Sequence, residues 1–210
     1  MNEWTQDKNI VIVHYPGYAG GKFIINCLGF NERCYPSILS NDLTYADKIP
    51  KLFATIPPSH EECKNWLNYE LSCGSFWPDR LNNIDFNQEI RLSDHARQTL
   101  NSKYCFMVTH GSMDLHRIKT QFPNAKHLEL VNYDKFIEIA MTIKTGSYEP
   151  LAYKPPPRGD FLFDIDSNIF DWDNFYPELV RCCQWLGIPP NFDPRLKEFY
   201  TAYMTLHTMP

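Results

Sequence analysis

The chain has 210 residues, of which 43% are hydrophobic and 21% are charged, and its net charge is −5. These proportions are typical of a globular protein and predict a single domain over residues 1–210. The acidic balance disfavours a broad nucleic-acid surface, and no apolar run is long enough to span a membrane. The sequence starts without a signal-peptide pattern, and its seven cysteines show no C-x-x-C spacing. We therefore expect a cytoplasmic protein with reduced thiols and with neither a nucleic-acid nor a membrane partner.

The first element in chain order is a β-branched run over residues 10–13, which leads into a glycine-rich turn and then into an apolar helical pattern over residues 23–28. This order predicts strand, loop and helix. The first amides of a helix have no partner within the helix, and the helix dipole favours negative charge. A helix entered through glycines is therefore typical of an anion site. The loop residues expected to bind the ligand are Gly17, Tyr18, Ala19, Gly20, Gly21, Lys22 and Phe23.

The loop departs from the Walker A pattern, G-x-x-x-x-G-K-[ST], at two positions. Pro16 stands at the first glycine, and Phe23 stands where a serine or threonine would hold Mg²⁺. A phenyl ring cannot ligate magnesium, which needs oxygen ligands. The pattern favours a phosphate or sulfate ligand whose transfer needs no metal held by the loop, with Lys22 neutralising the oxygen that leaves. The alternative is an ordinary strand-to-helix turn in which the glycines serve packing.

Residues from about 31 to 101 are rich in proline, asparagine and aromatic residues and contain no convincing strand. We interpret this range as an irregular, mostly helical insertion, with short helices predicted over residues 59–67 and 93–100. Insertions of this kind often form the acceptor side of a site. Most aromatic side chains are expected in the core, and Trp77-Pro78 is the pair in this insertion that we also consider for ligand contact.

Three further strands are predicted over residues 104–109, 127–131 and 161–165. Helices are predicted over about 113–121, after residue 134, and over about 174–186 and 193–206. Strands that alternate with helices predict an α/β fold, a parallel sheet with helices on both faces, in which the first three strands are neighbours. Ligands of such sheets lie beyond the carboxyl ends of the strands. Weaker candidates at this edge are Ser112, Asn132, Lys154 and Arg158, and the aspartates at 164–173 are expected as helix caps and solvated residues.

Three motifs of the chain resemble those of the sulfotransferase family, enzymes of P-loop fold that use 3′-phosphoadenosine 5′-phosphosulfate (PAPS). Tyr15-Pro16 before the helix entry is similar to the family's Y-P-K-S-G-T-T-W loop. Thr109-His110 is similar to its K-T-H motif, and residues 175–188 are similar to its late helix ending in F-L-G-I. The resemblance implies a P-loop, sulfotransferase-like domain, PAPS as the cofactor and His110 as the catalytic base.

Other positions depart from the family's pattern. Gly17 replaces the lysine that follows Tyr-Pro, and Val108 replaces the lysine of K-T-H. Asn132 and Ala140 stand where the family has the arginine and serine that bind the 3′-phosphate, and no R-K-G segment follows the late helix.

The sequence thus predicts transfer of a sulfuryl group from PAPS to a hydroxyl of a small molecule or carbohydrate, without a metal. His110 would take the acceptor's proton, Lys22 and the loop amides would hold the phosphosulfate, and Asn132 would contact the cofactor. One alternative is an ATP-using P-loop kinase, which Phe23 and the lack of a clear Walker B aspartate disfavour. The other is a non-catalytic member of the fold that binds a phosphorylated ligand or a partner protein, which the departures at Asn132 and Ala140 favour.

Overall fold

The protein has an α/β fold in the computed structural model, which describes residues 3–16, 19–35, 79–80, 94–110, 115–145 and 159–208. Its strands form one sheet in the order β2-β4-β1-β5-β6, and β3 also pairs with β4. Every pairing is parallel. The strands are β1 (Ile10–Tyr15), β2 (Cys34–Tyr35), β3 (Asp79–Arg80), β4 (Tyr104–His110), β5 (Lys126–Val131) and β6 (Phe161–Asp164).

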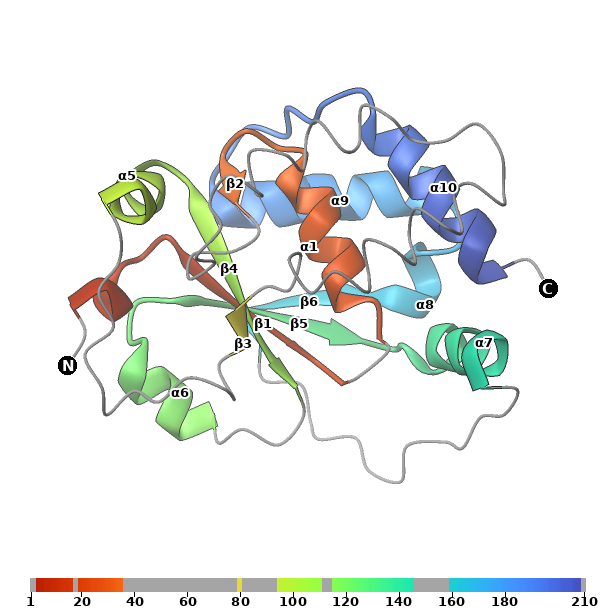
Figure 1. Ribbon diagram of the computed structural model, residues 1–210, viewed down its shortest axis with the longest axis horizontal. Helices are drawn as coiled ribbons and strands as arrows, with labels where there is room; N and C mark the ends of the chain where they lie inside the picture. Colours follow the sequence, from red (N-terminus) through yellow and green to blue (C-terminus); the bar gives the residue numbers. More distant parts are fainter. Residues whose placement is uncertain are drawn as a thin grey trace.

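Helices cover both faces of this sheet, as the alternating pattern predicts. Figure 1 shows α1, α9 and α10 on one side of β1 and β4 and α6 on the other. The helical elements are the 3-10 helix η1 (Glu3–Gln6) and the α-helices α1 (Gly21–Gly29), α5 (Asp94–Ser102), α6 (Leu115–Gln121), α7 (Asp134–Thr145), α8 (Ile165–Asn168), α9 (Trp172–Leu186) and α10 (Leu196–Thr208).

Alternate residues of the central strand β1 enter two different hydrophobic clusters. Val11 and Val13 face the larger one, which includes buried residues of α1, α7, α9 and α10. Ile10 and Ile12 face a smaller one, which includes Leu100 of α5 and Ile118 of α6. A strand that is apolar on both faces is typical of a parallel sheet buried on both sides, which is why β1 is an unbroken apolar run.

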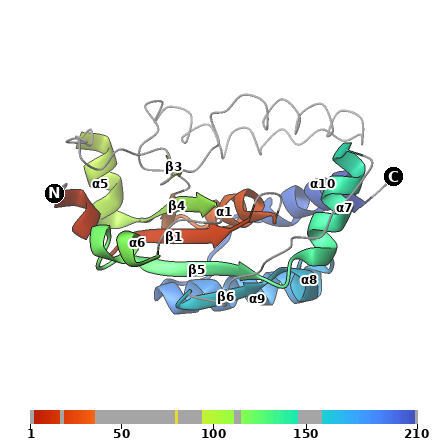
Figure 2. The same cartoon turned by 90° about the horizontal axis from the view of Figure 1, so that it is seen from below.

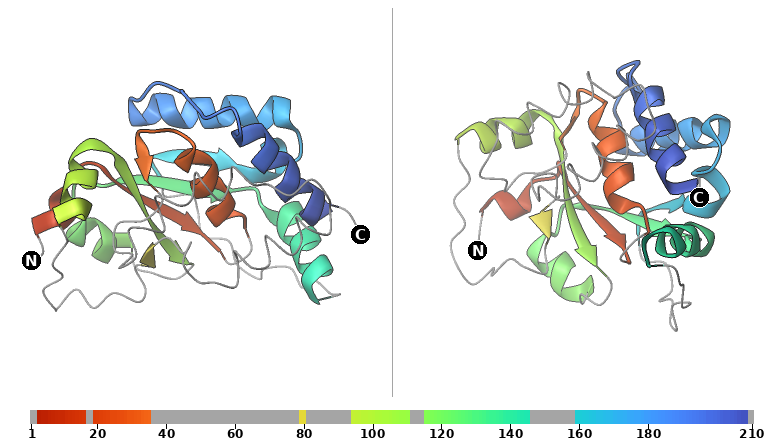
Figure 3. Two further views of the ribbon diagram at one scale, coloured as in Figure 1. Left: turned by 45° about the horizontal axis from the view of Figure 1, so that its top comes forward. Right: turned by 45° about the vertical axis from the view of Figure 1, so that its right-hand side comes forward.

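The carboxyl ends of the strands meet at one edge of the sheet. Figure 2 shows β4, β1 and β5 pointing the same way, toward α7 and α10. Figure 3 shows α10 beside α1 and ending close to α7, in agreement with the contacts between these helices. The loop that enters α1 therefore opens at the edge where α7 begins.

The predicted parallel neighbours are confirmed, because β1 lies between β4 and β5. The helix predicted over residues 93–100 corresponds to α5, and the late helix corresponds to α9, whose C-cap is Gly187 with φ of 78°. Two short strands, β2 and β3, fall within the range interpreted as an insertion without strands. The helix predicted over residues 59–67 lies outside the described residues.

Candidate functional site

The candidate site is built on the turn between β1 and α1. The strand ends at Tyr15, and the Ala19 amide donates to the Pro16 carbonyl at 3.3 Å. Gly20 is the N-cap of α1 with φ of 77°, a left-handed conformation that glycine adopts without steric cost. No side chain of the described residues caps this helix. Gly17 and Tyr18 lie outside the described residues.

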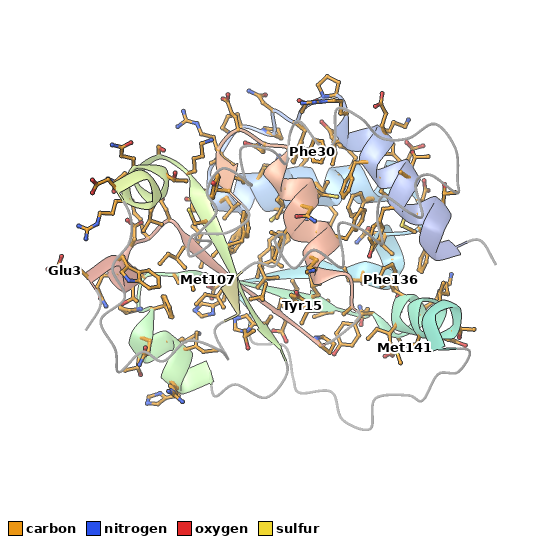
Figure 4. The ribbon with its side chains drawn as sticks, viewed as in Figure 1. Glu3, Tyr15, Phe30, Met107, Phe136 and Met141 are labelled. Atoms are coloured by element: carbon orange, nitrogen blue, oxygen red, sulfur yellow. The ribbon has the colours of Figure 1, made fainter. Side chains whose placement is uncertain are left out.

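Close packing around Gly20 and Gly21 holds this turn against two other elements. A Cβ atom built on Gly20 would lie 3.1 Å from Cε1 of Phe136 in α7 and 3.6 Å from Cδ1 of Ile169, which follows α8. A Cβ atom on Gly21 would overlap the ring of Tyr15. Figure 4 labels Tyr15 and Phe136, which both lie near the start of α1. Gly21 is therefore required by the close approach of the Tyr15 ring, whereas Gly20 is favoured by its left-handed φ and has little room beside Phe136.

Lys22, the second residue of α1, brings a cation to this helix start. The side chain is half-buried as a whole, and its Nζ atom is buried. A buried ammonium group is costly unless negative charge or hydrogen-bond acceptors surround it. The positive end of the helix dipole lies at the same place and adds to its field. The loop therefore concentrates positive charge at the carboxyl end of β1, where an anion would be stabilised.

Phe23, which occupies the metal-binding position of a Walker loop, points into the core. It is 1% exposed. Its ring stacks on Tyr203 of α10 with centroids 3.8 Å apart and on Phe175 of α9 at 5.5 Å. Only the backbone of Phe23 can therefore contact a ligand bound in the loop. Among the described residues, no group of three or more His, Cys, Asp or Glu side chains could hold a metal ion.

Of the other residues predicted at this edge of the sheet, the structure describes some and leaves others outside the described residues. The backbone of His110 is the register partner of Tyr15, so the last residue of β4 lies beside the last residue of β1. Asn132 follows β5 with a positive φ of 49°, and its side-chain amide donates to Asp164 at 2.7 Å. Ala140 lies within α7. Ser112, Lys154, Arg158 and Trp77-Pro78 lie outside the described residues.

The aspartates after β6 cap helices, as the sequence predicts. Asp164 accepts from the amide of Ser167 at the start of α8, and Asp171 accepts from that of Asp173 at the start of α9. Asp166 reaches across to α7, where its two carboxylate oxygens accept from the amides of Lys135 and Phe136, both at 2.9 Å. In this part of the chain, α7, α8 and α9 thus begin on a carboxylate, whereas α1 begins on Gly20 without one.

A pair of histidines on the other face of the sheet was not predicted as a site. His14 of β1 and His127 of β5 share a hydrogen bond, with Nε2 and Nδ1 2.9 Å apart, and their rings are stacked. His127 is buried, and burial lowers its pKa; nearby Asp160 opposes this shift and Lys119 adds to it. The sequence signal for this pair is one histidine within each of two apolar strands. Whether the two histidines contact each other depends on the register of β1 and β5, which the sequence does not indicate.

The five described cysteines are buried and free: Cys27, Cys34, Cys105, Cys182 and Cys183. Burial raises the pKa of Cys183 to about 12, although its hydrogen bond from Asn31 acts in the opposite direction. A thiol with so high a pKa is a weak nucleophile near neutral pH. The five cysteines pack within the two hydrophobic clusters of the core.

No protein-family model, curated protein or solved structure matches the chain significantly. In the described part of the chain, no helix has both the length and the apolar character needed to cross a membrane.

Proposed function

We propose that the protein is sulfotransferase-like and uses the β1–α1 loop to bind the phosphosulfate group of PAPS. The observation that carries this proposal is the start of α1, where Gly20 leaves the helix without a side-chain cap and Lys22 buries its Nζ atom. Backbone amides and a lysine at the carboxyl end of a central parallel strand suit a phosphate or sulfate group. The free, buried thiols support the further proposal of a cytoplasmic location.

In the proposed reaction, a hydroxyl oxygen of a small molecule or carbohydrate attacks the sulfur atom in line with the bridging oxygen. A new oxygen–sulfur bond forms as the sulfur–oxygen bond to the 5′-phosphate breaks, and the electron pair stays on the phosphate oxygen. Lys22 and the first amides of α1 stabilise that charge. His110, whose backbone lies beside Tyr15, takes the acceptor proton.

The geometry supports this assignment over an ATP-using kinase, because the ring of Phe23 fills the core where a magnesium-holding hydroxyl would be needed. A second candidate is a non-catalytic protein that binds a phosphorylated ligand. The hydrogen bond from Asn132 to Asp164 favours it, because the amide at the expected 3′-phosphate position is held by a carboxylate.

The direct test is to incubate the protein with PAPS and a panel of hydroxyl acceptors and to measure release of adenosine 3′,5′-bisphosphate. We expect release that depends on the acceptor and is unaffected by a metal chelator. Stabilisation by PAPS or sulfate without release would favour the non-catalytic candidate. The absence of both binding and release would contradict the loop assignment itself.

A further inference from the structure

The starts of α1 and α7 lie near each other at the candidate site, and they differ in whether a carboxylate of the chain binds their amides. The loop residue Gly20 lies against Phe136 in the first turn of α7 and against Ile169 just after α8. The Phe136 side chain therefore connects the first turn of α7 to the loop that enters α1, and the two helix starts are separated by about the length of this side chain. A ligand with two phosphate groups could in principle use both helix starts.

The start of α7 already holds an anion that belongs to the chain. Both carboxylate oxygens of Asp166 accept hydrogen bonds from α7 amides. The amide of Asp166 in turn donates to the carbonyl of Asn132 at 2.7 Å, so α8 is fixed to the turn between β5 and α7. Asp166 is half-buried, which limits the screening of its charge by solvent.

Among the described residues, several carboxylates lie around this start of α7. Asp134 is its first residue, and Asp164 lies at the end of β6 with its carboxylate on Asn132 and Ser167. Lys135 is a cation in the same turn, and its Nζ atom lies 4.6 Å from the centre of the Phe170 ring. A second phosphate of the ligand at the start of α7 would find the backbone amides there already bound to Asp166. The nearby carboxylates would also repel it.

We propose that Asp166 is a specificity residue that prevents a second phosphate of the ligand from adding affinity, so that the ligand is recognised by the negative charge at the end held by α1. This inference rests on the proposed function and narrows its donor class. The site recognises a nucleoside 5′-phosphosulfate or 5′-phosphate, and a 3′-phosphate contributes no affinity. The internal carboxylate takes the place that a second ligand phosphate would need at α7.

The test compares the dissociation constants of adenosine 5′-monophosphate and adenosine 3′,5′-bisphosphate by calorimetry. We expect the wild-type protein to bind the monophosphate at least as tightly as the bisphosphate. In Asp166→Asn, one side-chain oxygen can still accept from an α7 amide while the charge is lost. The ratio should then shift toward the bisphosphate by about fivefold or more, because a unit charge near the ligand is removed.

Asp193→Asn is the matched control, because Asp193 also accepts from a backbone amide near a helix start, that of Arg195, and lies just before α10. It should leave the ratio as in the wild type. Tighter wild-type binding of the bisphosphate, or a ratio unchanged in Asp166→Asn, would overturn the inference and leave the loop assignment standing. If neither nucleotide binds and sulfate gives no stabilisation, the proposed function fails as well. The wild-type ratio decides the question even where Asp166→Asn does not fold.

Discussion

The ring of Tyr15, the last residue of β1, fills the space that a side chain on Gly21, the first residue of α1, would need. We therefore expect Gly21→Ala to destabilise the protein by about 1–3 kcal/mol, the usual range for overpacking a core. The same change should weaken sulfate binding, because relief of the clash moves the first turn of α1. Urea unfolding and calorimetry measure the two effects.

Two further variants separate this clash from a general cost of replacing glycine. Gly187→Ala places a side chain in open space at φ of 78°, so it should cost only the left-handed strain of about 1–2 kcal/mol and leave sulfate binding unchanged. The double variant Tyr15→Ala, Gly21→Ala should be more stable than the sum of the single changes predicts. Strict additivity would show that Tyr15 is not what excludes a side chain at position 21.

Lys22→Met keeps most of the side-chain volume and removes its charge. If the ammonium group faces a bound anion, stabilisation by sulfate should fall several-fold, because stabilisation by a ligand follows its occupancy. Without sulfate, the unfolding temperature of the variant gives the baseline from which this shift is measured. Thermal unfolding over a sulfate titration measures both quantities. An unchanged sulfate-dependent shift would remove Lys22 from the site.

Phe23→Thr restores the residue type of a Walker loop but should not create a magnesium site. The position faces the aromatic cluster of α9 and α10, so the change should destabilise the protein by about 3–5 kcal/mol, as for other large-to-small core changes. Phe23→Leu, which stays apolar, should be less harmful. Unfolding experiments with and without Mg²⁺ measure the effect. Stabilisation of Phe23→Thr by Mg²⁺ would mean that this side chain reaches the loop.

His110→Ala tests whether the protein is an enzyme. Loss of a general base usually lowers the rate about 10²–10⁴-fold. Affinity for adenosine 3′,5′-bisphosphate should hardly change, because the imidazole acts on the acceptor. Turnover and nucleotide binding are measured on the same preparation. Equal loss of both would indicate a structural role for His110 and not a catalytic one.

The sequence was sufficient to predict the main sheet, because β1, β4 and β5 are apolar runs separated by helical patterns. It did not predict β2 or β3, because two residues carry no periodicity. The predicted fourth strand was one residue too long. Ile165 is apolar like the strand residues before it, but it begins α8 after the Asp164 cap.

Part of the candidate site, like part of the fold, could be predicted from the sequence. The glycines, Lys22 and the departure at Phe23 are local in the sequence and could be read from it. The contact of Gly21 with Tyr15 and the stacking of Phe23 on Tyr203 depend on how α1 packs, and Asp166 reaches α7 from 30 residues away. Such relationships come from tertiary structure, so no local pattern could indicate them.

The last prediction concerns the pH dependence of stability. Burial lowers the pKa of His127 below the ordinary value of about 6.5, and although Asp160 opposes the shift, the net direction is downward. The unfolded chain therefore binds a proton at a higher pH than the folded protein does. The stability that neutral His127 provides is complete above about pH 6.5 and is lost as the pH falls from there through the folded pKa. His127→Gln should flatten this slope below about pH 6.5, at the cost of the hydrogen bond to His14. Urea unfolding at several pH values measures it, and an identical slope in the variant would assign the acid sensitivity to other groups.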